Sequence, residues 1–333
     1  MGNDGPPKVA VVIPFFQQQS GLLQTALRSV AAQTLLNGES PTPRATVHVI
    51  VVDDTSPLSP SGELAEIERP NGLEIEVLRQ PNGGPGSARN AGIERAAALG
   101  CGYVALLDSD DHWAPEHLAA ALAGLSEAPF YFANSMHDDV PSFSYFEAMR
   151  KRSAADAGVI AAGEVFSVLL DECVPHTSQV VYSLADFPDV RFDETMQRTG
   201  EDHLFWLTIA ERRVPFAFNF AIMGSRGRGV SVYREALPWD SAGFIPRLID
   251  AFHFRSLVAS RFTLDAEQAA INSRHRRQAA DEIAFALARR LMRSPAHAVS
   301  AVGAIAREGP SLWAMLVAAV PRLLRIRRRM LAA

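Results

Sequence analysis

Three carboxylates within four residues follow an apolar segment of this 333-residue chain. The run Tyr103-Val-Ala-Leu-Leu ends in Asp108-Ser109-Asp110-Asp111. Carboxylates at this density repel one another, so the turn needs water or a cation to offset its charge. Asp108 and Asp110 are two residues apart and offer the oxygen ligands that Mg²⁺ or Mn²⁺ takes, often together with substrate phosphates. The alternative for an isolated D-x-D is an acidic turn that only caps the next helix.

Polar residues also follow earlier apolar segments. Asp53 and Asp54 come after residues 46–52, where a carboxylate could accept a hydrogen bond from a base or ribose, or simply start a turn. Residues 82–90 place three glycines before an expected helix, and backbone N–H groups there suit a phosphate. Arg89 would add a charge-assisted contact, and a plain helix-start turn is the alternative.

Downstream of the acidic turn, Asp202 is the leading candidate for a catalytic base, and Glu201 precedes it at an expected helix start. A base for an acceptor hydroxyl must be a carboxylate that faces the metal site across a substrate-sized gap. The alternative is a pair of acids that only interact with the helix dipole. Arg226 and Arg228, among glycines, would neutralise a diphosphate or form an exposed basic turn. His176 would face the acceptor or the metal, or be a hydrogen-bonded core histidine.

Composition narrows the class of protein. The net charge of −5 argues against a nucleic-acid binder, and 48% hydrophobic and 21% charged residues fit a folded soluble protein. Two cysteines make neither a disulfide scaffold nor a metal-ligand set, which suits the cytosol. The sequence contains neither a signal-peptide pattern nor the ~20 uninterrupted apolar residues of a membrane span, so we expect a cytoplasmic protein.

The candidate residues would meet at one edge of a sheet. Apolar, β-branched runs alternate with helical patterns, which predicts an α/β fold with a mainly parallel central sheet and helices on both faces. Ligands of such sheets bind beyond the carboxyl ends of the strands. The expected strands are residues 8–14, 46–52, 73–79 and 103–107.

Five motifs follow one another along the chain: V-A-V-V-I-P-F-F at 9–16, V-V-D-D-T-S at 51–56, N-G-G-P-G-S-A-R-N-A-G at 82–92, L-L-D-S-D-D-H-W at 106–113 and G-E-D at 200–202. In this order they resemble the motifs of family 2 glycosyltransferases, which have the GT-A nucleotide-sugar fold. The sequences of residues 80–90 and of the loop that begins at Arg226 further resemble those of bacterial exopolysaccharide glycosyltransferases of the succinoglycan type.

This resemblance implies roles for individual residues. Asp110 and Asp108 would hold Mn²⁺ or Mg²⁺, and Asp202 would deprotonate the acceptor. His176, Glu201, Arg226 and Arg228 would lie near the acceptor or the diphosphate. The nucleotide-sugar site would comprise Pro14, Phe15, Asp53, Asp54, Asn82, Gly86, Arg89, Asp108, Ser109 and Asp110.

The resemblance, together with the helical pattern beyond residue 240, predicts a domain organisation. A GT-A domain would span residues 1–240, with a nucleotide-binding part at about 8–113 and an acceptor part at about 114–240. A helical C-terminal extension would span residues 241–333 and end in a basic amphipathic tail. Residues 309–333 carry five arginines and no acids, so the tail at 310–333 would bind an anionic membrane surface or pack on the domain.

The implied activity is inverting, metal-dependent transfer of a single hexose from a UDP-sugar to a lipid-linked glycan acceptor in cell-surface polysaccharide synthesis. Processive synthases carry a Gln-x-x-Arg-Trp signature, which does not follow Asp202 here. One alternative is a sugar-phosphate nucleotidyltransferase, although the glycine-rich loop expected after its first strand is replaced by Pro-Phe-Phe-Gln-Gln-Gln at residues 14–19. The other is a non-catalytic glycan-binding protein on a degenerate transferase fold.

Overall fold

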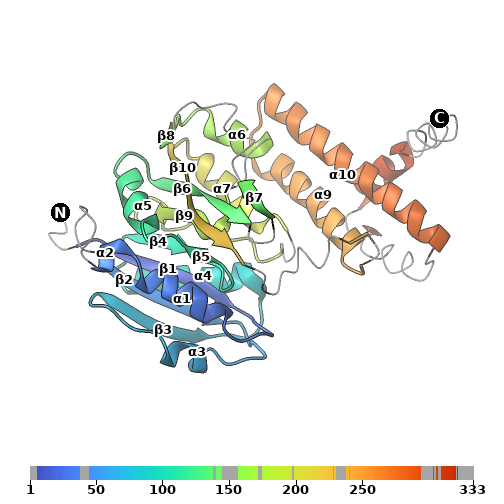
Figure 1. Ribbon diagram of the computed structural model, residues 1–333. Helices are drawn as coiled ribbons and strands as arrows, with labels where there is room; N and C mark the ends of the chain where they lie inside the picture. Colours follow the sequence, from blue (N-terminus) through green and yellow to red (C-terminus); the bar gives the residue numbers. More distant parts are fainter. Residues whose placement is uncertain are drawn as a thin grey trace. The chain divides into compact units, whose positions relative to one another are not determined.

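The computed structural model describes residues 6–37, 45–137, 140–144, 157–171, 175–196, 199–227, 229, 238–239, 241–293, 303, 305–306, 309–319 and 321. The chain forms two compact units, the first made of residues 1–197 and 201–230 and the second of residues 198–200 and 231–333. The first holds the sheet, and the second is helical in its described part (Figure 1).

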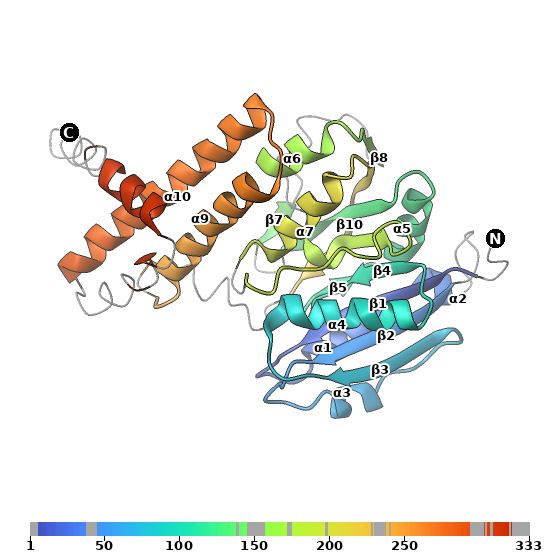
Figure 2. The same cartoon turned by 180° about the vertical axis from the view of Figure 1, so that it is seen from behind.

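Four parallel strands open the first unit, as the sequence predicts. They are β1 (Lys8–Phe15), β2 (Thr46–Asp53), β3 (Leu73–Arg79) and β4 (Tyr103–Leu106). β1 pairs with β2 and β4, and β2 pairs with β3. Helix α1 (Leu22–Ala31) covers one face of these strands in Figure 1, and helix α4 (Gly84–Ala98) covers the opposite face in Figure 2.

Alternation along β1 explains the two layers of helices. Its odd-numbered apolar residues share one buried cluster with Leu23 and Leu27 of α1. Its even-numbered side chains point to the other face, where Val12 meets α4. An added Cβ at Gly92 would lie 2.3 Å from Val12 Cγ1, so glycine is required for this close approach of helix and strand.

Beyond β4 the sheet becomes mixed. Its strand order is β3-β2-β1-β4-β9-β6-β10-β5, with β9 antiparallel to both neighbours and β10 parallel to β6. The predicted parallel character therefore holds for the first half of the sheet, and the second half continues the same sheet. The added strands are β5 (His112–Trp113), β6 (Phe130–His137), β9 (Val180–Ser183) and β10 (Phe216–Arg226), with β7 (Val140–Ser144) on β6 and β8 (Ala157–Ile160) on β10.

Short helices connect these strands, and one of them carries candidate site residues. Helix α7 (Glu201–Ala210) begins with two acids and buries most of its later residues. The short 3-10 turn η2 (Thr177–Gln179) comes directly before β9. The remaining helical segments are α2 (Thr34–Asn37), α3 (Ser61–Ala65), α5 (His117–Leu125) and α6 (Val165–Asp171).

An aromatic core holds α7 against the second half of the sheet. Phe130 stacks on Phe216 with ring centroids 4.0 Å apart and meets Trp206 of α7 edge-on at 5.4 Å. Phe192 stacks on Phe205 of the same helix at 4.3 Å. Such pairs contribute about 0.5–1.5 kcal/mol each beyond area burial. This packing fixes the N-terminal end of α7, where Glu201 and Asp202 lie.

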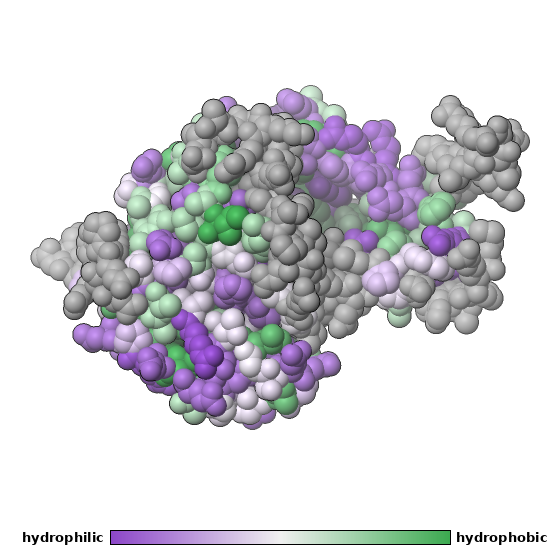
Figure 3. Space-filling model, viewed as in Figure 1, coloured by the Kyte–Doolittle hydropathy of each residue, from purple (hydrophilic) through white to green (hydrophobic). Residues whose placement is uncertain are grey.

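The second unit confirms the predicted helical C-terminal region. Helices α9 (Phe244–Arg261) and α10 (Ala266–Arg293) pack around a buried cluster that includes Leu312 and Leu316 from the helix at 310–319. In Figure 3 hydrophilic side chains line the visible side of α10, whereas hydrophilic and hydrophobic residues are mixed over the visible face of the first unit. Within the described residues, no helix combines the length and the apolar character needed to cross a membrane.

Candidate active site

The parallel register brings the strand ends together at one edge of the sheet. Phe15, at the end of β1, pairs with Asp53, at the end of β2. Gln17 is 2% exposed and joins three segments there: its Nε2 donates to Ser109 Oγ at 2.7 Å, and its N–H donates to Ser56 Oγ at 2.9 Å. Ser56 N–H in turn donates to Asp53 Oδ1 at 2.8 Å. The predicted convergence of these segments is present, with Gln17 as the link that the sequence did not identify.

Two of the expected nucleotide-binding positions in this region are partly or fully buried. Phe15 is fully buried in the core, and the neighbouring Phe16, 39% exposed, is the aromatic ring that a ligand could reach. Pro14 pairs with Val52 within the sheet and is half-buried. Asp53 is buried, and its Oδ2 has a contact of 3.6 Å with the exposed Arg79. Asp53 is therefore better placed than Phe15 to meet a ligand.

Asp54 binds the glycine loop of its own chain. Its Oδ1 accepts hydrogen bonds from Gly83 N–H at 2.8 Å and from Gln80 Nε2 at 2.8 Å, and its Oδ2 accepts one from Gly84 N–H at 2.9 Å. Asn82 Nδ2 donates to the Asp54 carbonyl at 3.0 Å. This carboxylate thus supplies the negative charge that the start of α4 favours. Two N–H groups of the loop therefore have an acceptor within the chain, and the phosphate contact of residues 82–90 stays a prediction.

Arg89 joins the acidic turn to α7. It is 4% exposed, and its Nη2 lies 2.7 Å from Asp108 Oδ1 while its Nη1 lies 3.2 Å from Glu201 Oε1. Although burial alone would raise the pKa of Asp108, the charge and hydrogen bond of Arg89 hold it below its usual range. Phe192 lies under the guanidinium, 5.3 Å away, and an added Cβ on Gly86 would be 3.4 Å from Phe192 Cβ. The guanidinium of Arg89 therefore already pairs with two carboxylates, and a diphosphate bound there, as predicted, would share it with them.

Asp111 is the most enclosed acid of the turn, at 2% exposure. Ser178 Oγ donates to its Oδ2 at 2.5 Å, and Gly227 N–H donates to its Oδ1 at 2.9 Å. Burial, followed by the charges of Asp110 and Asp108, raises the pKa of Asp111 well above its ordinary value. Two hydrogen bonds therefore hold this carboxylate in place beside the two other acids of the turn.

Asp110 contacts the loop that follows β10. Gly229 N–H donates to Asp110 Oδ2 at 2.8 Å, and burial, with the charge of Asp108, raises the pKa of Asp110. An added Cβ on Gly227 would lie 1.7 Å from the Asp110 carbonyl oxygen, so this approach requires glycine. The charge of Arg226, at the end of β10, acts to lower the pKa of both Asp110 and Asp108. Arg228 lies outside the described residues.

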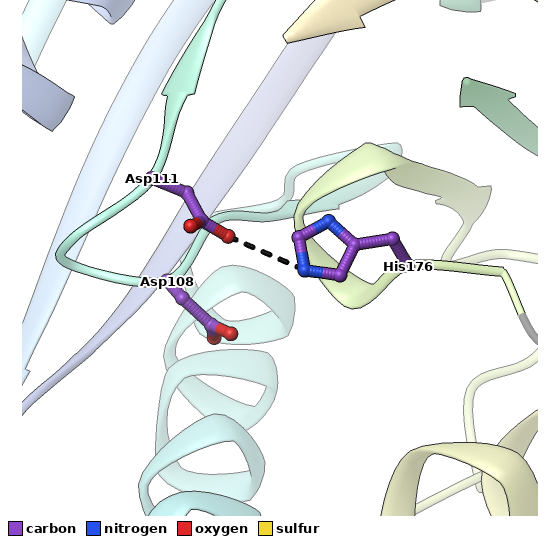
Figure 4. A group of neighbouring side chains, drawn as sticks. All are labelled: Asp108, Asp111 and His176. Carbon is purple, nitrogen blue, oxygen red and sulfur yellow. Dashed lines mark ion pairs between the residues drawn. The ribbon is translucent and has the colours of Figure 1, made fainter. Parts of the chain in front are cut away.

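Among the described residues, one group could hold a metal ion: Asp108, Asp111 and His176, which offer ligand atoms all within 4.8 Å of one another. Their side chains point toward a common space in Figure 4, and His176 Nε2 lies 3.5 Å from Asp111 Oδ2. Two carboxylates and an imidazole fit Mn²⁺ and are compatible with Mg²⁺. Asp110 does not belong to this group. The sequence identified Asp108 and His176 but did not assign Asp111, although three neighbouring acids were the signal.

Asp202 lies on the first turn of α7. His203 N–H donates to its Oδ1 at 2.7 Å, and Thr177 Oγ donates to its Oδ2 at 3.2 Å. Burial raises the pKa of Asp202, which brings this carboxylate closer to the range of a base that works near neutrality. Burial and the charge of Asp202 raise the pKa of the adjacent Glu201 to about 7. The side chain of Thr177 was not identified from the sequence.

Comparison with known proteins assigns the chain to a protein family. The sequence model described as glycosyl transferase family 2 matches residues 10–173. The succinoglycan biosynthesis protein ExoW of Rhizobium meliloti (strain 1021) is 32% identical over 266 residues, covering 77% of this chain and 79% of that protein. The chain belongs to glycosyl transferase family 2. The protein is therefore a glycosyltransferase, and the predicted GT-A fold is confirmed.

Other relatives match a smaller part of this chain. An uncharacterized glycosyltransferase of Rickettsia bellii (strain RML369-C) is 30% identical over 210 residues, which are 62% of this chain and 27% of that protein. The succinoglycan biosynthesis protein ExoO of Rhizobium meliloti (strain 1021) is 36% identical over 115 residues, which are 34% of this chain and 29% of that protein.

Solved structures share the fold of this family 2 enzyme. The crystal structure of S. aureus TarS 1-349 aligns with a TM-score of 0.56 at 18% identity, covering 86% of this chain and 72% of that chain. The same protein in complex with UDP-GlcNAc aligns with a TM-score of 0.54 at 19% identity, covering 84% of this chain and 81% of that chain. At these identities the likeness establishes the fold alone.

Proposed function

We propose that this enzyme transfers a single hexose from a UDP-sugar to a lipid-linked glycan, with inversion at the anomeric carbon, in the assembly of a bacterial exopolysaccharide. The observation that carries the proposal is a set of contacts that links the group Asp108–Asp111–His176 to the start of α7. Arg89 pairs with Asp108 and with Glu201, and Thr177, next to His176, donates to Asp202. The relative named for succinoglycan biosynthesis and the neighbour crystallised with UDP-GlcNAc support the choice of donor and product.

The nucleotide would lie at the carboxyl edge of the parallel strands. Asp53, with Oδ2 turned to the exposed Arg79, would accept a hydrogen bond from the base or ribose. Phe16 offers an exposed ring beside it. Asp54 would act indirectly, because its carboxylate holds the start of α4 through Gly83 and Gly84.

The diphosphate would lie against the acidic turn. Asp108, Asp111 and His176 would hold Mn²⁺ or Mg²⁺, with Asp110 beside them. When bound, such an ion would supply positive charge against the leaving diphosphate. Arg226 would add charge from the end of β10, because its guanidinium already acts on Asp108 and Asp110. Arg89 would keep Asp108 ionised and oriented.

Asp202 would accept the proton of the acceptor hydroxyl. Its two oxygens are oriented by His203 N–H and Thr177 Oγ, so its remaining lone pairs have a defined direction. A base on the opposite side of the anomeric carbon from the leaving group gives an in-line displacement, which inverts the configuration. Positioned bases contribute about 10²–10⁴-fold in rate.

The C-terminal helix would bring the enzyme to its lipid-linked acceptor. In the helix at 310–319, Leu312 and Leu316 are buried, whereas Trp313 and Val317 are 41% and 68% exposed. Five arginines follow in the sequence outside the described residues. Exposed apolar side chains beside arginines would favour an anionic membrane surface from the cytoplasmic side, at about 1 kcal/mol for each arginine near the surface.

A donor screen tests the proposed reaction. The protein is mixed with UDP-glucose, UDP-galactose or UDP-GlcNAc, a lipid-linked oligosaccharide and Mn²⁺, and released UDP is measured. We expect one donor to give acceptor-dependent UDP that is lost with EDTA. A parallel mixture of sugar-1-phosphate and UTP is expected to give no diphosphate. Diphosphate there, or no UDP from any donor, would contradict the proposal.

A further inference from the structure

A three-residue turn contacts both halves of the candidate site. His176 Nε2 lies 3.5 Å from Asp111 Oδ2, Thr177 Oγ donates to Asp202 Oδ2 at 3.2 Å, and Ser178 Oγ donates to Asp111 Oδ2 at 2.5 Å. The first and third of these side chains therefore contact Asp111 of the metal-ligand group, and the second contacts the expected base, Asp202.

The turn is fixed on the side of the sheet as well. Asp108 N–H donates to Ser178 Oγ at 3.0 Å, and the indole N–H of Trp113 donates to the carbonyl of Ser178. The strand β9 begins two residues after Ser178 and pairs with β4, the strand that precedes Asp108. Thr177 and Ser178 are 5% and 0% exposed, so these hydrogen bonds are shielded from water.

We propose that Thr177 and Ser178 are positioning residues that set the place of the base relative to the metal-ligand group, Thr177 by orienting Asp202 and Ser178 by orienting Asp111. This inference rests on the proposed function, because it assigns Asp202 and Asp111 the roles given there. It goes further because it assigns both tasks to one short turn, residues 176–178. This turn would hold the metal-ligand group that stabilises the leaving group and the base that activates the acceptor.

Thr177 acts through one oxygen of Asp202. The other oxygen accepts the His203 N–H, so removal of the threonine hydroxyl frees one side of the carboxylate to rotate. The charged groups that also act on Asp202 are Arg89 of α4 and Asp108 of the acidic turn, and Glu201 adjoins it on α7. None of these groups is changed by a substitution at residue 177.

Ser178 acts on Asp111 from the opposite side to the Gly227 N–H. Outer-shell partners of metal ligands typically change metal affinity by about 10–100-fold when they are removed. Ser178 also accepts the Asp108 N–H, so its loss would loosen two members of the ligand group at once.

Thr177→Val and Thr177→Ser test the first half. Val keeps the shape without the hydroxyl, so kcat should fall about tenfold, with donor KM unchanged and the acid limb of the kcat profile shifted to higher pH, because the lost hydrogen bond favours the ionised carboxylate. Ser keeps the hydroxyl and should restore both. Unchanged kcat and pH profile in Thr177→Val, beside an active wild type, would overturn this half; an inactive wild type would instead contradict the proposed function.

Ser178→Ala tests the second half without an activity assay. Bound Mn²⁺ is measured by electron paramagnetic resonance in the presence of UDP, and we expect about tenfold weaker binding than in the wild type, with Thr177→Val within twofold of it. Thermal unfolding checks each variant. Ser178→Cys, with a weaker donor of similar size, should give intermediate affinity and replaces Ser178→Ala where that variant does not fold. Wild-type affinity in both variants, or no Mn²⁺ binding by the wild type, would overturn this half.

Discussion

The guanidinium of Arg89 lies 2.7 Å from the carboxylate of Asp108, although Arg89 belongs to a helix and Asp108 to the turn after a strand. Arg89 is 4% exposed and also contacts Glu201, so one buried cation lies between the acidic turn and the start of α7. Burial of a charge is tolerated only when it is paired and hydrogen-bonded. The same two ion pairs of Arg89 therefore stabilise the fold and fix the geometry of the site.

Arg89→Met should lower the free energy of unfolding by about 2–4 kcal/mol, because it leaves Asp108 and Glu201 without their cation in a largely buried setting. Chemical denaturation measures the change. Arg95→Met is the matched control, since Arg95 is on the same helix and pairs with Glu76 at the surface, with side chains 40% and 33% exposed. The control should change stability much less, because solvent and salt screen an exposed ion pair. Equal losses in both variants would contradict a special role for Arg89.

Glu201 should make stability depend on pH. Its pKa in the folded protein is about 7, against an ordinary value of 4.5, so the folded state binds more protons between these values. Its contribution to stability is therefore present at about pH 4.5 and is lost as pH rises to 7. Glu201→Gln should remove this contribution, on the order of 1–3 kcal/mol, from the slope measured by denaturation in EDTA. An identical slope in the variant would contradict the assignment.

Asp54→Ala should destabilise the protein by about 1–3 kcal/mol, because the N–H groups of Gly83 and Gly84 lose their acceptor at the start of α4. Folded Asp54→Ala should bind UDP within a few-fold of the wild type. Asp53→Ala is the comparison, and its larger effect should be on UDP affinity. Isothermal titration with UDP and thermal unfolding separate the two. A variant of Asp54 with normal stability and lost UDP binding would reverse these assignments.

The basic tail should direct membrane binding. Five arginines at residues 322–329 changed to glutamine should abolish co-sedimentation with vesicles that contain anionic lipid at low salt, because each arginine contributes about 1 kcal/mol near such a surface. Substitution is preferable to deletion from Gly309, since Leu312 and Leu316 belong to the core of the second unit. Neutral vesicles are the control. Equal sedimentation of wild type and variant would show that these arginines do not direct membrane binding.

Much of the fold follows from local sequence. β-branched runs such as residues 46–52 predict buried parallel strands, and their carboxyl ends gather Asp53 and Asp108 at one edge, as observed. The mixed second half of the sheet was not foreseen as part of the same sheet. Its strands are short, and β9 and β6 pair across about fifty residues, which periodicity cannot reveal.

The site was predictable as a set of residues but not as a set of contacts. The acids at 108–111 and 201–202 were evident from their density and position. The partners of those acids were not: Ser178 lies 67 residues from Asp111, and Gly227 lies 116 residues from it. Asp54 illustrates the same limit, because whether a carboxylate faces a ligand or the chain's own N–H groups depends on how the glycine loop folds back on it.

The kinetics of Asp202→Asn, compared with its UDP binding, show whether Asp202 is the base that activates the acceptor. Asparagine keeps the shape of Asp202 but cannot accept a proton, so kcat for sugar transfer should fall about 10²–10⁴-fold while UDP affinity stays within about threefold of the wild type. Asp189→Asn, at a surface acid paired with Arg212, should leave both unchanged. A collapse of UDP affinity with kcat preserved would show that Asp202 binds or caps, and would contradict its assignment as the base.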